Sequence, residues 1–271
     1  DIMAGKTAQR SEPPDGKRPR GGTTRGGSGV ASRTLGMLGT IMERAVRDGT
    51  IPKNPVRGVA RPKDGERKPP FSFTNLEAVG RAMRELKEEG ENEVGLQAIR
   101  FLLISGCRRE EALQLKQSIV DRNAHCLRFD DTKSGKQIRP VGRSALEMIS
   151  PQTESAKAGV YIFPGSGIKG HFVGLPKVWK RVCKRAGIEG VPVHGMRHWF
   201  AAAATEMNYS ELTIAGLLGH KVKGVTARYA TAPDTALLAA ADAISLRISQ
   251  ALDGEKSGKI LKFSPSRTSI P

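Results

Sequence analysis

The chain has 271 residues, and its 44 Lys and Arg against 27 Asp and Glu give a formal net charge of +17 and an isoelectric point near 10.1. So large an excess of positive charge is typical of proteins that bind polyanions, and double-stranded DNA is the expected partner. No apolar run approaches the roughly 20 residues of a membrane-spanning helix and no signal-peptide pattern opens the chain, which argues against a membrane protein. The three cysteines, an odd number in apolar segments, indicate reduced thiols and a cytoplasmic location.

The segment from residue 4 to residue 29 is rich in Gly, Pro, Arg and Lys. Because such a composition cannot bury a core, we expect a flexible basic loop. Its cations, among them Arg18, Arg20 and Arg25, are suited to contacts with DNA phosphates.

A helix is predicted from Ala31 to Asp48, where apolar residues recur at helical spacing and Gly49 follows as a stop signal. Residues 61–71 are rich in Pro and in charge, which indicates an extended linker. The chain therefore divides into a first part, residues 1–60, and a larger part that begins at residue 72.

Two helices are predicted directly after the linker. Thr74 to Glu77 has the form of a capping box, which predicts a helix from Thr74 to about Glu89. A more apolar helix follows from about Val94 to Ile104 and places Arg108 just beyond its end.

A β-hairpin is predicted from the strands Cys126–Phe129 and Gln137–Val141, with a turn at Ser134-Gly135. Lys133 and Lys136 lie at its tip. A lysine on a hairpin tip can swing into a reaction site, and a cationic neighbourhood lowers its pKa toward a range useful for proton donation. Either lysine could serve as a general acid, and Lys136 is also a candidate for contact with DNA.

Gly165 to Gly170 matches the Gly-x-Gly-x-x-Gly pattern of dinucleotide-binding loops and follows the apolar run Val160 to Phe163. Glu189 stands about twenty residues on, as that motif requires. However, Pro164 interrupts the passage from strand to turn, and no series of alternating strands and helices surrounds it. A flexible loop near DNA is the preferred interpretation.

A basic helix is predicted from Leu175 to Ala186, with Lys177, Lys180 and Arg181 between apolar residues at helical spacing. Such a helix can simply turn its basic face to solvent. The overall charge of the chain favours contact with DNA phosphates instead.

Further along, a helix from Met196 to Met207 would place His194 and Arg197, three residues apart, on one face. The next predicted helix runs from Ser210 to Gly219 and leads to His220.

A short helix from Gly224 to Ala230 should carry Tyr229. The segment from Asp234 to Leu252 has strong helical character, and its simplest role is to close the core of its own domain. The tail, residues 253–271, is polar and basic without a clear period, so we expect it to be disordered.

Several Arg and His donors together are suited to stabilise the negative charge that develops on phosphate oxygens during transesterification. Arg108 and Arg197 can each grip two oxygens with the planar guanidinium. A tyrosine phenol has a pKa of about 10, so Tyr229 needs positive charge or a base beside it to act as a nucleophile.

Each residue also has an ordinary explanation. Tyr229 could be a packed aromatic, His220 a residue at a helix end, Arg108 part of a solvated charge run, and Lys133 a turn residue. The joint occurrence of these residues in one order decides against these explanations. A zinc motif of the His-Glu-x-x-His type at His194 fails, because Gly195 replaces the glutamate and no third ligand is evident.

The order of the six residues resembles that of the tyrosine recombinases, the phage integrase family, over most of the chain from about Val30 to Leu252. The six are Arg108, Lys133, His194, Arg197, His220 and Tyr229. The resemblance implies that Tyr229 is the nucleophile, that the Arg and His residues bind the phosphate, and that Lys133 rather than Lys136 is the general acid. Glu111, in an Arg-x-x-Glu pattern with Arg108, would orient that arginine.

The resemblance implies a mostly α-helical fold with a small antiparallel β-sheet or hairpin (α+β). Residues 1–60 would be the C-terminal part of a helical core-binding domain and residues 72–252 the catalytic recombinase domain. The chain starts with Asp1 and offers few helices before the linker, so we expect its N-terminal part to be missing.

The implied function is site-specific DNA recombination, in which a mobile element is integrated or excised through a 3′-phosphotyrosyl intermediate. No metal or ATP is expected, since no P-loop and no acidic cluster for paired Mg²⁺ ions appears. The expected assembly is a homotetramer on paired sites, in which the C-terminal helix packs on the neighbouring protomer and accessory DNA-bending proteins can assist. The alternatives are a non-catalytic DNA-binding relative and a type IB topoisomerase-like relaxing enzyme.

Overall fold

The computed structural model describes residue 4 and residues 26–62, 71–130, 135–149, 161–188, 190–220 and 234–255. The chain divides into two compact units, residues 1–68 and 69–271. The division falls inside the segment predicted as a linker. Lys133, Tyr229 and the cations Arg18, Arg20 and Arg25 lie outside the described residues.

The described part of the first unit consists of helix α1 (Ser28–Arg47) and the segment that packs back along it. Asn54 donates from Nδ2 to the carbonyl of Gly39 and to Glu43, each over 2.9 Å. The helix begins inside the segment expected to be a loop, so that boundary was wrong. The first turn of a helix tolerates such residues because its N–H groups have no intrahelical partner.

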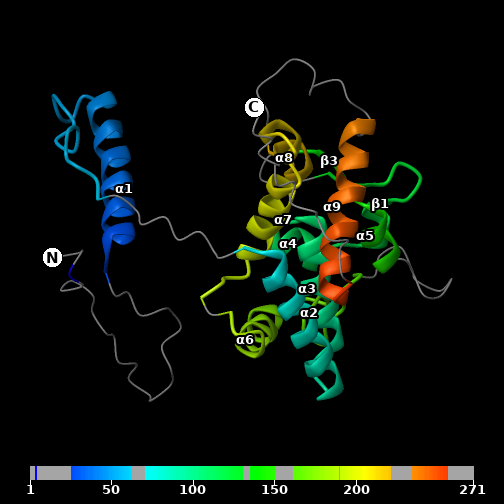
Figure 1. Cartoon of the computed structure of the whole chain (residues 1–271). Helices are drawn as coiled ribbons and strands as arrows, with labels where there is room; N and C mark the ends of the chain where they lie inside the picture. Colours follow the sequence, from blue (N-terminus) through cyan, green and yellow to red (C-terminus); the bar gives the residue numbers. More distant parts are fainter. Residues whose placement is uncertain are drawn as a thin grey trace, which may run out of the picture. The chain divides into compact units, whose positions relative to one another are not determined.

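The second unit contains eight α-helices and three short strands within its described residues (Figure 1). In chain order they are α2 (Phe73–Glu88), α3 (Glu93–Ser105), α4 (Arg109–Leu113), the 3₁₀ turn η1 (Gln117–Ile119), β1 (Val120–Asp121), β2 (Cys126–Phe129), β3 (Gln137–Pro140), α5 (Arg143–Met148), α6 (Leu175–Arg185), α7 (Gly195–Glu206), α8 (Glu211–Leu218) and α9 (Thr235–Asp253). The predicted fold class, mostly helical with a small antiparallel sheet, is confirmed.

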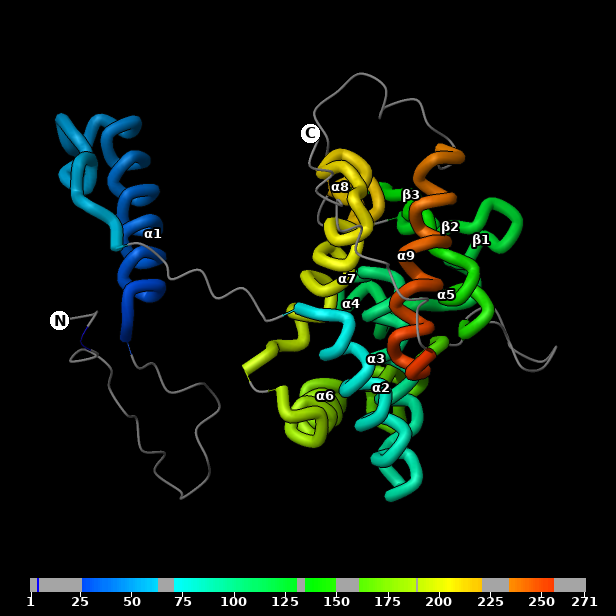
Figure 2. Tube along the Cα trace, viewed as in Figure 1, coloured from blue at the N-terminus to red at the C-terminus, as the bar shows by residue number. Residues whose placement is uncertain are grey.

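Helix α3 forms the centre of this unit, with α2, α6, α7 and α9 packed around it (Figure 2). Its side chains are buried almost along the whole helix, including Phe101 and Leu103. A helix that is apolar over most of its surface needs neighbours over most of its surface, which explains its central place.

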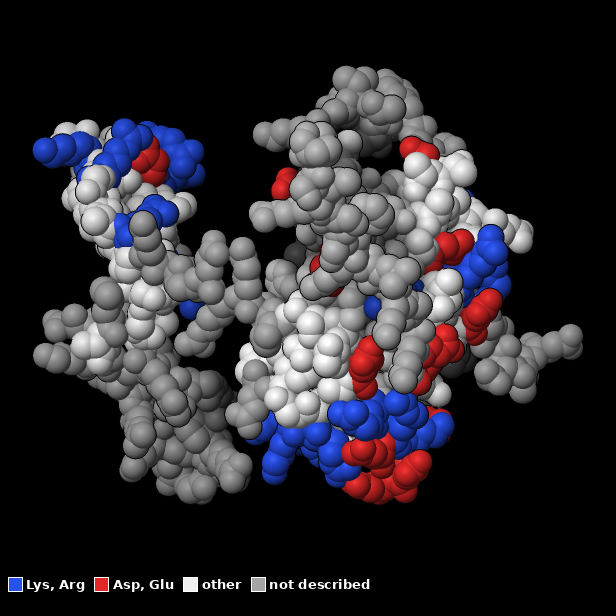
Figure 3. Space-filling view, in the orientation of Figure 1, with Lys and Arg blue, Asp and Glu red and all other residues white. Residues whose placement is uncertain are grey.

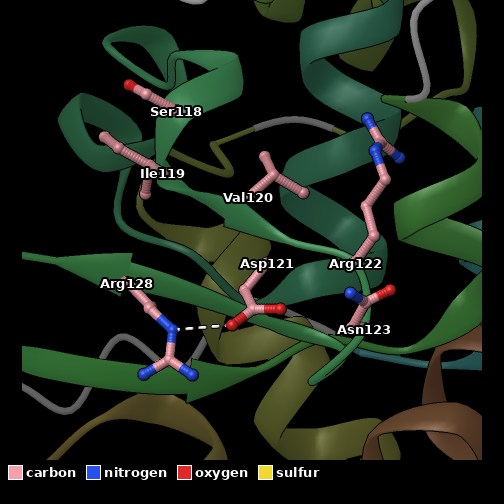
Figure 4. A pocket seen from close by; sticks show the side chains of 7 residues that line it. All are labelled: Ser118, Ile119, Val120, Asp121, Arg122, Asn123 and Arg128. Carbon is pink, nitrogen blue, oxygen red and sulfur yellow. Dashed lines mark hydrogen bonds and ion pairs between the residues drawn. The ribbon is translucent and has the colours of Figure 1, made fainter.

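The three strands form one antiparallel sheet in the order β1-β2-β3. The predicted hairpin is confirmed, with Phe129 opposite Gln137 and Cys126 opposite Pro140. Strand β1 was not predicted. Arg128 of β2 donates from Nε to Asp121 of β1 over 2.7 Å, and both residues line a shallow surface hollow (Figure 4).

Helix α2 begins earlier than the sequence pattern indicates. Ser72 lies in an extended conformation, and its hydroxyl accepts the N–H of Asn75 over 3.0 Å. Ser72 is therefore the N-cap, and the prediction of a cap at Thr74 was wrong. Either hydroxyl could satisfy a free N–H group, and the sequence pattern did not distinguish them.

Helix α9 closes the core of its own unit, against α2 in particular. Arg84 donates from Nη1 to the carbonyl of Leu252 over 2.6 Å, and Arg100 forms an ion pair with Asp253. The ordinary role expected for this helix, closing the core of its own domain, is therefore found here, and its packing on a neighbouring protomer stays a prediction. Its apolar residues, such as Ile244 and Ile248, are buried in the hydrophobic core of the second unit.

The Gly-rich segment Gly165–Gly170 forms a turn rather than a cofactor loop. An isolated antiparallel bridge between Pro164 and His171 closes it, and no helix begins there, since α6 starts only at Leu175. Within the described residues, no helix combines the length and the apolar character needed to cross a membrane.

Candidate active site

Arg108 reaches the site because of the way α3 ends. Gly106 caps α3 in the left-handed conformation, with φ of 62°, and a Cβ there would lie 2.7 Å from the ring of Phe200. Only glycine fits both requirements. The chain then turns, and Arg108 becomes the N-cap of α4.

Glu111 holds Arg108 in place. Its carboxylate accepts the backbone N–H of Arg108 over 2.9 Å and the side-chain Nη1 over 2.7 Å. This is the orienting role expected for Glu111. About a third of the Arg108 side chain, 34%, stays exposed and available to a ligand.

Arg139 on β3 is the second partner of Glu111, and its side chain is fully buried. It donates from Nη1 and Nη2 to the carboxylate, and from Nη2 to Gln137 over 2.9 Å. Burial would raise the pKa of Glu111, but Arg139 and then Arg108 lower it to about 2. The carboxylate is thus ionised at any pH near neutrality.

Arg197 on α7 is fixed by backbone carbonyls. It donates from Nη1 to Gly106 over 2.8 Å and from Nη2 to Leu218 over 2.7 Å, so it joins the ends of α3 and α8. Burial, and then the charges of Arg139 and Arg108, lower its pKa to about 10. It remains a cation near neutral pH.

The two histidines flank Arg197. His194 is the residue before α7, and its ring meets that of His198 edge to face at 4.9 Å. His220 follows the left-handed cap Gly219 of α8, and its Nε2 lies 3.1 Å from Nη2 of Arg197. Burial lowers the pKa of both rings, and the nearby arginines lower it further.

The structure therefore brings together four of the six residues selected from the sequence: Arg108, His194, Arg197 and His220. They come from three separate segments, and Arg197 and Arg108 both lower the pKa of the two histidines, which reflects their proximity. Preorganised cations grouped in this way suit an anionic phosphate. Lys133 and Tyr229 stay predictions.

Sequence reasoning missed Arg139. It lies opposite Leu127 in the register of β2 and β3, so its side chain shares the core-facing side of the sheet. A buried arginine requires an acidic partner, so this requirement could have linked Arg139 with a carboxylate of the site.

The proposed DNA-contact residues Lys136, Lys177, Lys180 and Arg181 are all exposed. Arg181 on α6 donates from Nη2 to Glu91 over 2.8 Å, so its charge is balanced. Lys177 and Lys180 form no ion pair within the described residues. Figure 3 shows basic and acidic side chains side by side at the lower end of the second unit, around α2 and α6.

The cysteines Cys107, Cys126 and Cys183 are free and buried. Burial raises the pKa of Cys183 to about 12, which keeps it a thiol. Within the described residues, no group of three or more His, Cys, Asp or Glu side chains is arranged to hold a metal ion.

Several known integrases resemble this chain in structure. The integrase from mycobacterium phage Brujita has a TM-score of 0.52 at 20% identity, over 80% of this chain and 77% of that one. Lambda integrase bound to DNA has a TM-score of 0.56 at 18% identity, over 73% of this chain and 72% of that one. A lambda integrase tetramer bound to a Holliday junction also has 0.56 at 18% identity, over 74% and 61%. At such identities the likeness shows the fold.

Among curated proteins, prophage integrase IntF from Escherichia coli strain K12 is 24% identical over 143 residues. The match covers 51% of this chain but only 30% of that relative. A model of the phage integrase family matches residues 73–235, which is more than half of the chain. With this match and the convergence of its Arg and His residues, the chain belongs to the phage integrase family.

Proposed function

We propose that this protein is a site-specific DNA recombinase that cleaves and rejoins strands to integrate or excise a mobile element. The observation that carries the proposal is the convergence of Arg108, Arg197, His194 and His220 from separate segments on one position. Arginine forks stabilise the extra charge of a phosphoryl transition state more than they stabilise the ground state.

Tyr229 supplies the nucleophile. It stands nine residues after His220 and five before Asp234, by their numbers. Both ends of this segment are held in one unit, where Leu237 of α9 packs within 3.1 Å of the position a Gly216 Cβ would take on α8. An extended chain spans about 3.5 Å per residue, so a segment of this length is long enough to bring its tyrosine to the site of the same chain.

The reaction is a transesterification in two balanced steps. The phenolate oxygen of Tyr229 attacks phosphorus, the bond from phosphorus to the 5′-oxygen breaks, and a 3′-phosphotyrosine remains. The 5′-oxygen leaves with a proton. In the second step a 5′-hydroxyl of the partner strand attacks the phosphotyrosine and releases the phenol, so no nucleotide is hydrolysed.

A histidine accepts the proton that the phenol of Tyr229 loses. A guanidinium carries donors only, so Nε2 of His220 accepts from Arg197, and a neutral ring then carries its proton on Nδ1. His194 is also kept neutral by its lowered pKa, and it can accept the proton of Tyr229.

Lys133 donates the proton to the leaving 5′-oxygen. Its position on the chain supports this role, because the hairpin lies against the end of α8. Gln137 of β3 donates from Nε2 to the carbonyl of Gly219 over 3.2 Å, next to His220. Lys133 stands four positions before Gln137, a span of at most about 14 Å. Lys136 is the rival on the same turn.

The proposed partner is duplex DNA, and the proposed assembly is a homotetramer on paired sites. The charge of +17 supports the first, and the lambda integrase tetramer on a Holliday junction supports the second. The C-terminal helix α9 is the proposed contact between protomers, and Leu246 on it is 52% exposed.

The test is incubation with a nicked duplex that carries an end of the mobile element, where loss of the short fragment traps the covalent intermediate. The parent protein should form an adduct stable to denaturant, Tyr229→Phe should form none, and Tyr209→Phe should behave like the parent. An adduct that persists in Tyr229→Phe would refute the role of Tyr229.

A further inference from the structure

A fully buried arginine at the edge of the site needs an explanation. Arg139 has no exposed surface, and taking its charge out of water is unfavourable even though Glu111 pairs with it. A hydrophobic residue on β3 would fill the same space without that cost. The charge therefore has a role beyond packing.

The Arg139 side chain donates hydrogen bonds to two groups that hold the site, Glu111 and Gln137. Its Nη1 and Nη2 donate to Glu111, the carboxylate that also holds Arg108. Its Nη2 donates to Oε1 of Gln137, whose Nε2 in turn donates to Gly219. One chain of hydrogen bonds thus connects Arg108 on α4, through β3, with the residue before His220.

The backbone of α8 is built for this close approach. Gly219 has φ of 65°, and a Cβ there would lie 2.8 Å from Oε1 of Gln137 and 2.9 Å from Nη2 of Arg139. A side chain at this position would push both groups away. The end of α8 is therefore fitted to Arg139 and Gln137.

We propose that Arg139, with Gln137, is a positioning residue that fixes Arg108 through Glu111 and His220 through Gly219. The proposal rests on the proposed recombinase function, since it concerns how the phosphate-binding groups are held. Arg139 touches no substrate. It shares Glu111 with Arg108, which keeps the carboxylate from drawing Arg108 away from the phosphate.

The shared carboxylate predicts the effect of losing Arg139. In Arg139→Met, Glu111 keeps Arg108 as its cation within the network and draws it inward. A displacement of about 1 Å in a positioning group can cost about 100-fold in rate. Duplex binding should stay within about 3-fold, because many phosphate contacts share the affinity.

The experiment measures single-turnover cleavage of the nicked duplex, its Kd and thermal unfolding for Arg139→Met and for the matched control Arg100→Met. Arg100 ties α3 to Asp253 of α9, so its loss weakens the fold away from this network. We expect a roughly 100-fold slower cleavage for Arg139→Met and a nearly parental rate for Arg100→Met, both below their unfolding temperatures. Equal rates for the two variants would overturn the proposal.

A double-variant cycle separates positioning from packing. The effects of Arg139→Met and Glu111→Gln on the cleavage rate should be strongly non-additive, whereas those of Arg100→Met and Glu111→Gln should multiply. Additive effects in the first pair would contradict the shared role. If Arg139→Met does not fold, Gln137→Met cuts the connection to Gly219 without a buried charge and should slow cleavage about 10-fold.

A readout without cleavage distinguishes this inference from the proposed function. In ¹H–¹⁵N spectra the side-chain Nε–H signal of Arg108 should be sharp in the parent and in Arg100→Met, and broadened or lost in Arg139→Met. An unchanged signal would overturn the inference even if the parent forms no adduct. A parent that forms no adduct would refute the recombinase activity alone.

Discussion

Arg197 donates from Nη2 to Nε2 of His220 over 3.1 Å, and the same nitrogen donates to the carbonyl of Leu218. The ring of His220 is thereby held by a cation that cannot accept a proton. Protonation of Nε2 would break this hydrogen bond and place two positive charges side by side. The contact therefore ties the integrity of the site to pH.

Stability should fall as the pH drops through the range in which histidine titrates. Burial, and then the arginines, lower the pKa of His220 in the folded protein below that in the unfolded chain. The folded state then binds fewer protons, so the stabilisation is complete above the unfolded pKa of about 6.5 and is lost as the pH decreases below it. Urea unfolding at about pH 8 and about pH 5.5 should show a larger loss for the parent than for His220→Gln. Equal losses would contradict the contact.

Removal of the Arg108 side chain should slow cleavage at least about 100-fold, because an arginine that stabilises developing charge contributes on this scale. Arg109→Ala is the matched control, since the neighbouring side chain pairs with Glu110 and is 47% exposed. It should cleave like the parent. Gel-shift titration should show nearly parental binding for both variants, and a collapse of binding in Arg108→Ala alone would make it an anchor rather than a catalytic group.

Lys180 on α6 should contribute one phosphate contact. In Lys180→Ala the slope of log K against log salt should decrease by about 1, as for the loss of one phosphate contact. Arg181→Ala should change the slope less, because the guanidinium is paired with Glu91. Fluorescence titrations on one duplex at several salt concentrations give both slopes. A larger change for Arg181→Ala would mean that this ion pair opens on DNA.

The contact of α2 with α9 should depend on Gly80. A Cβ at this position would lie 1.8 Å from the carbonyl oxygen of Leu252. Gly80→Ala should therefore lower the free energy of unfolding by about 3 kcal/mol, the upper end for overpacked cores. Gly36→Ala in α1, where the nearest atom is Nη1 of Arg61 at 3.9 Å, should leave the unfolding of the second unit unchanged. Parental thermal stability of Gly80→Ala would show that α9 does not dock this closely.

Much of the fold could be predicted because local signals mark it. Apolar spacing and stop residues located the helices α3, α6, α7 and α8 to within about one or two residues, as expected for strong periodicity. Local rules failed where two hydroxyls compete, as Ser72 and Thr74 do for the cap of α2. They also failed for strand β1, whose two residues are too few to show a period.

The site was predicted from residue order, not from contacts. The order of Arg108, His194, Arg197 and His220 was enough to select them, because the chemistry of phosphate demands such donors. Arg139 was not selected, because the sequence of a strand shows that an arginine faces the core only when its register with the neighbouring strand is known. The packing partner of α9 could not be chosen from the sequence, since the same apolar face could be buried in its own unit or on a partner protomer.

Peptide mapping of the trapped adduct shows whether Tyr229 becomes joined to DNA. The three tyrosines, Tyr161, Tyr209 and Tyr229, fall in three different tryptic peptides. Mass spectrometry of the parent treated with the nicked duplex should find the nucleotide on the peptide that begins with Tyr229. A nucleotide on the peptide of Tyr161 or Tyr209, or on none of the three, would exclude Tyr229 as the nucleophile.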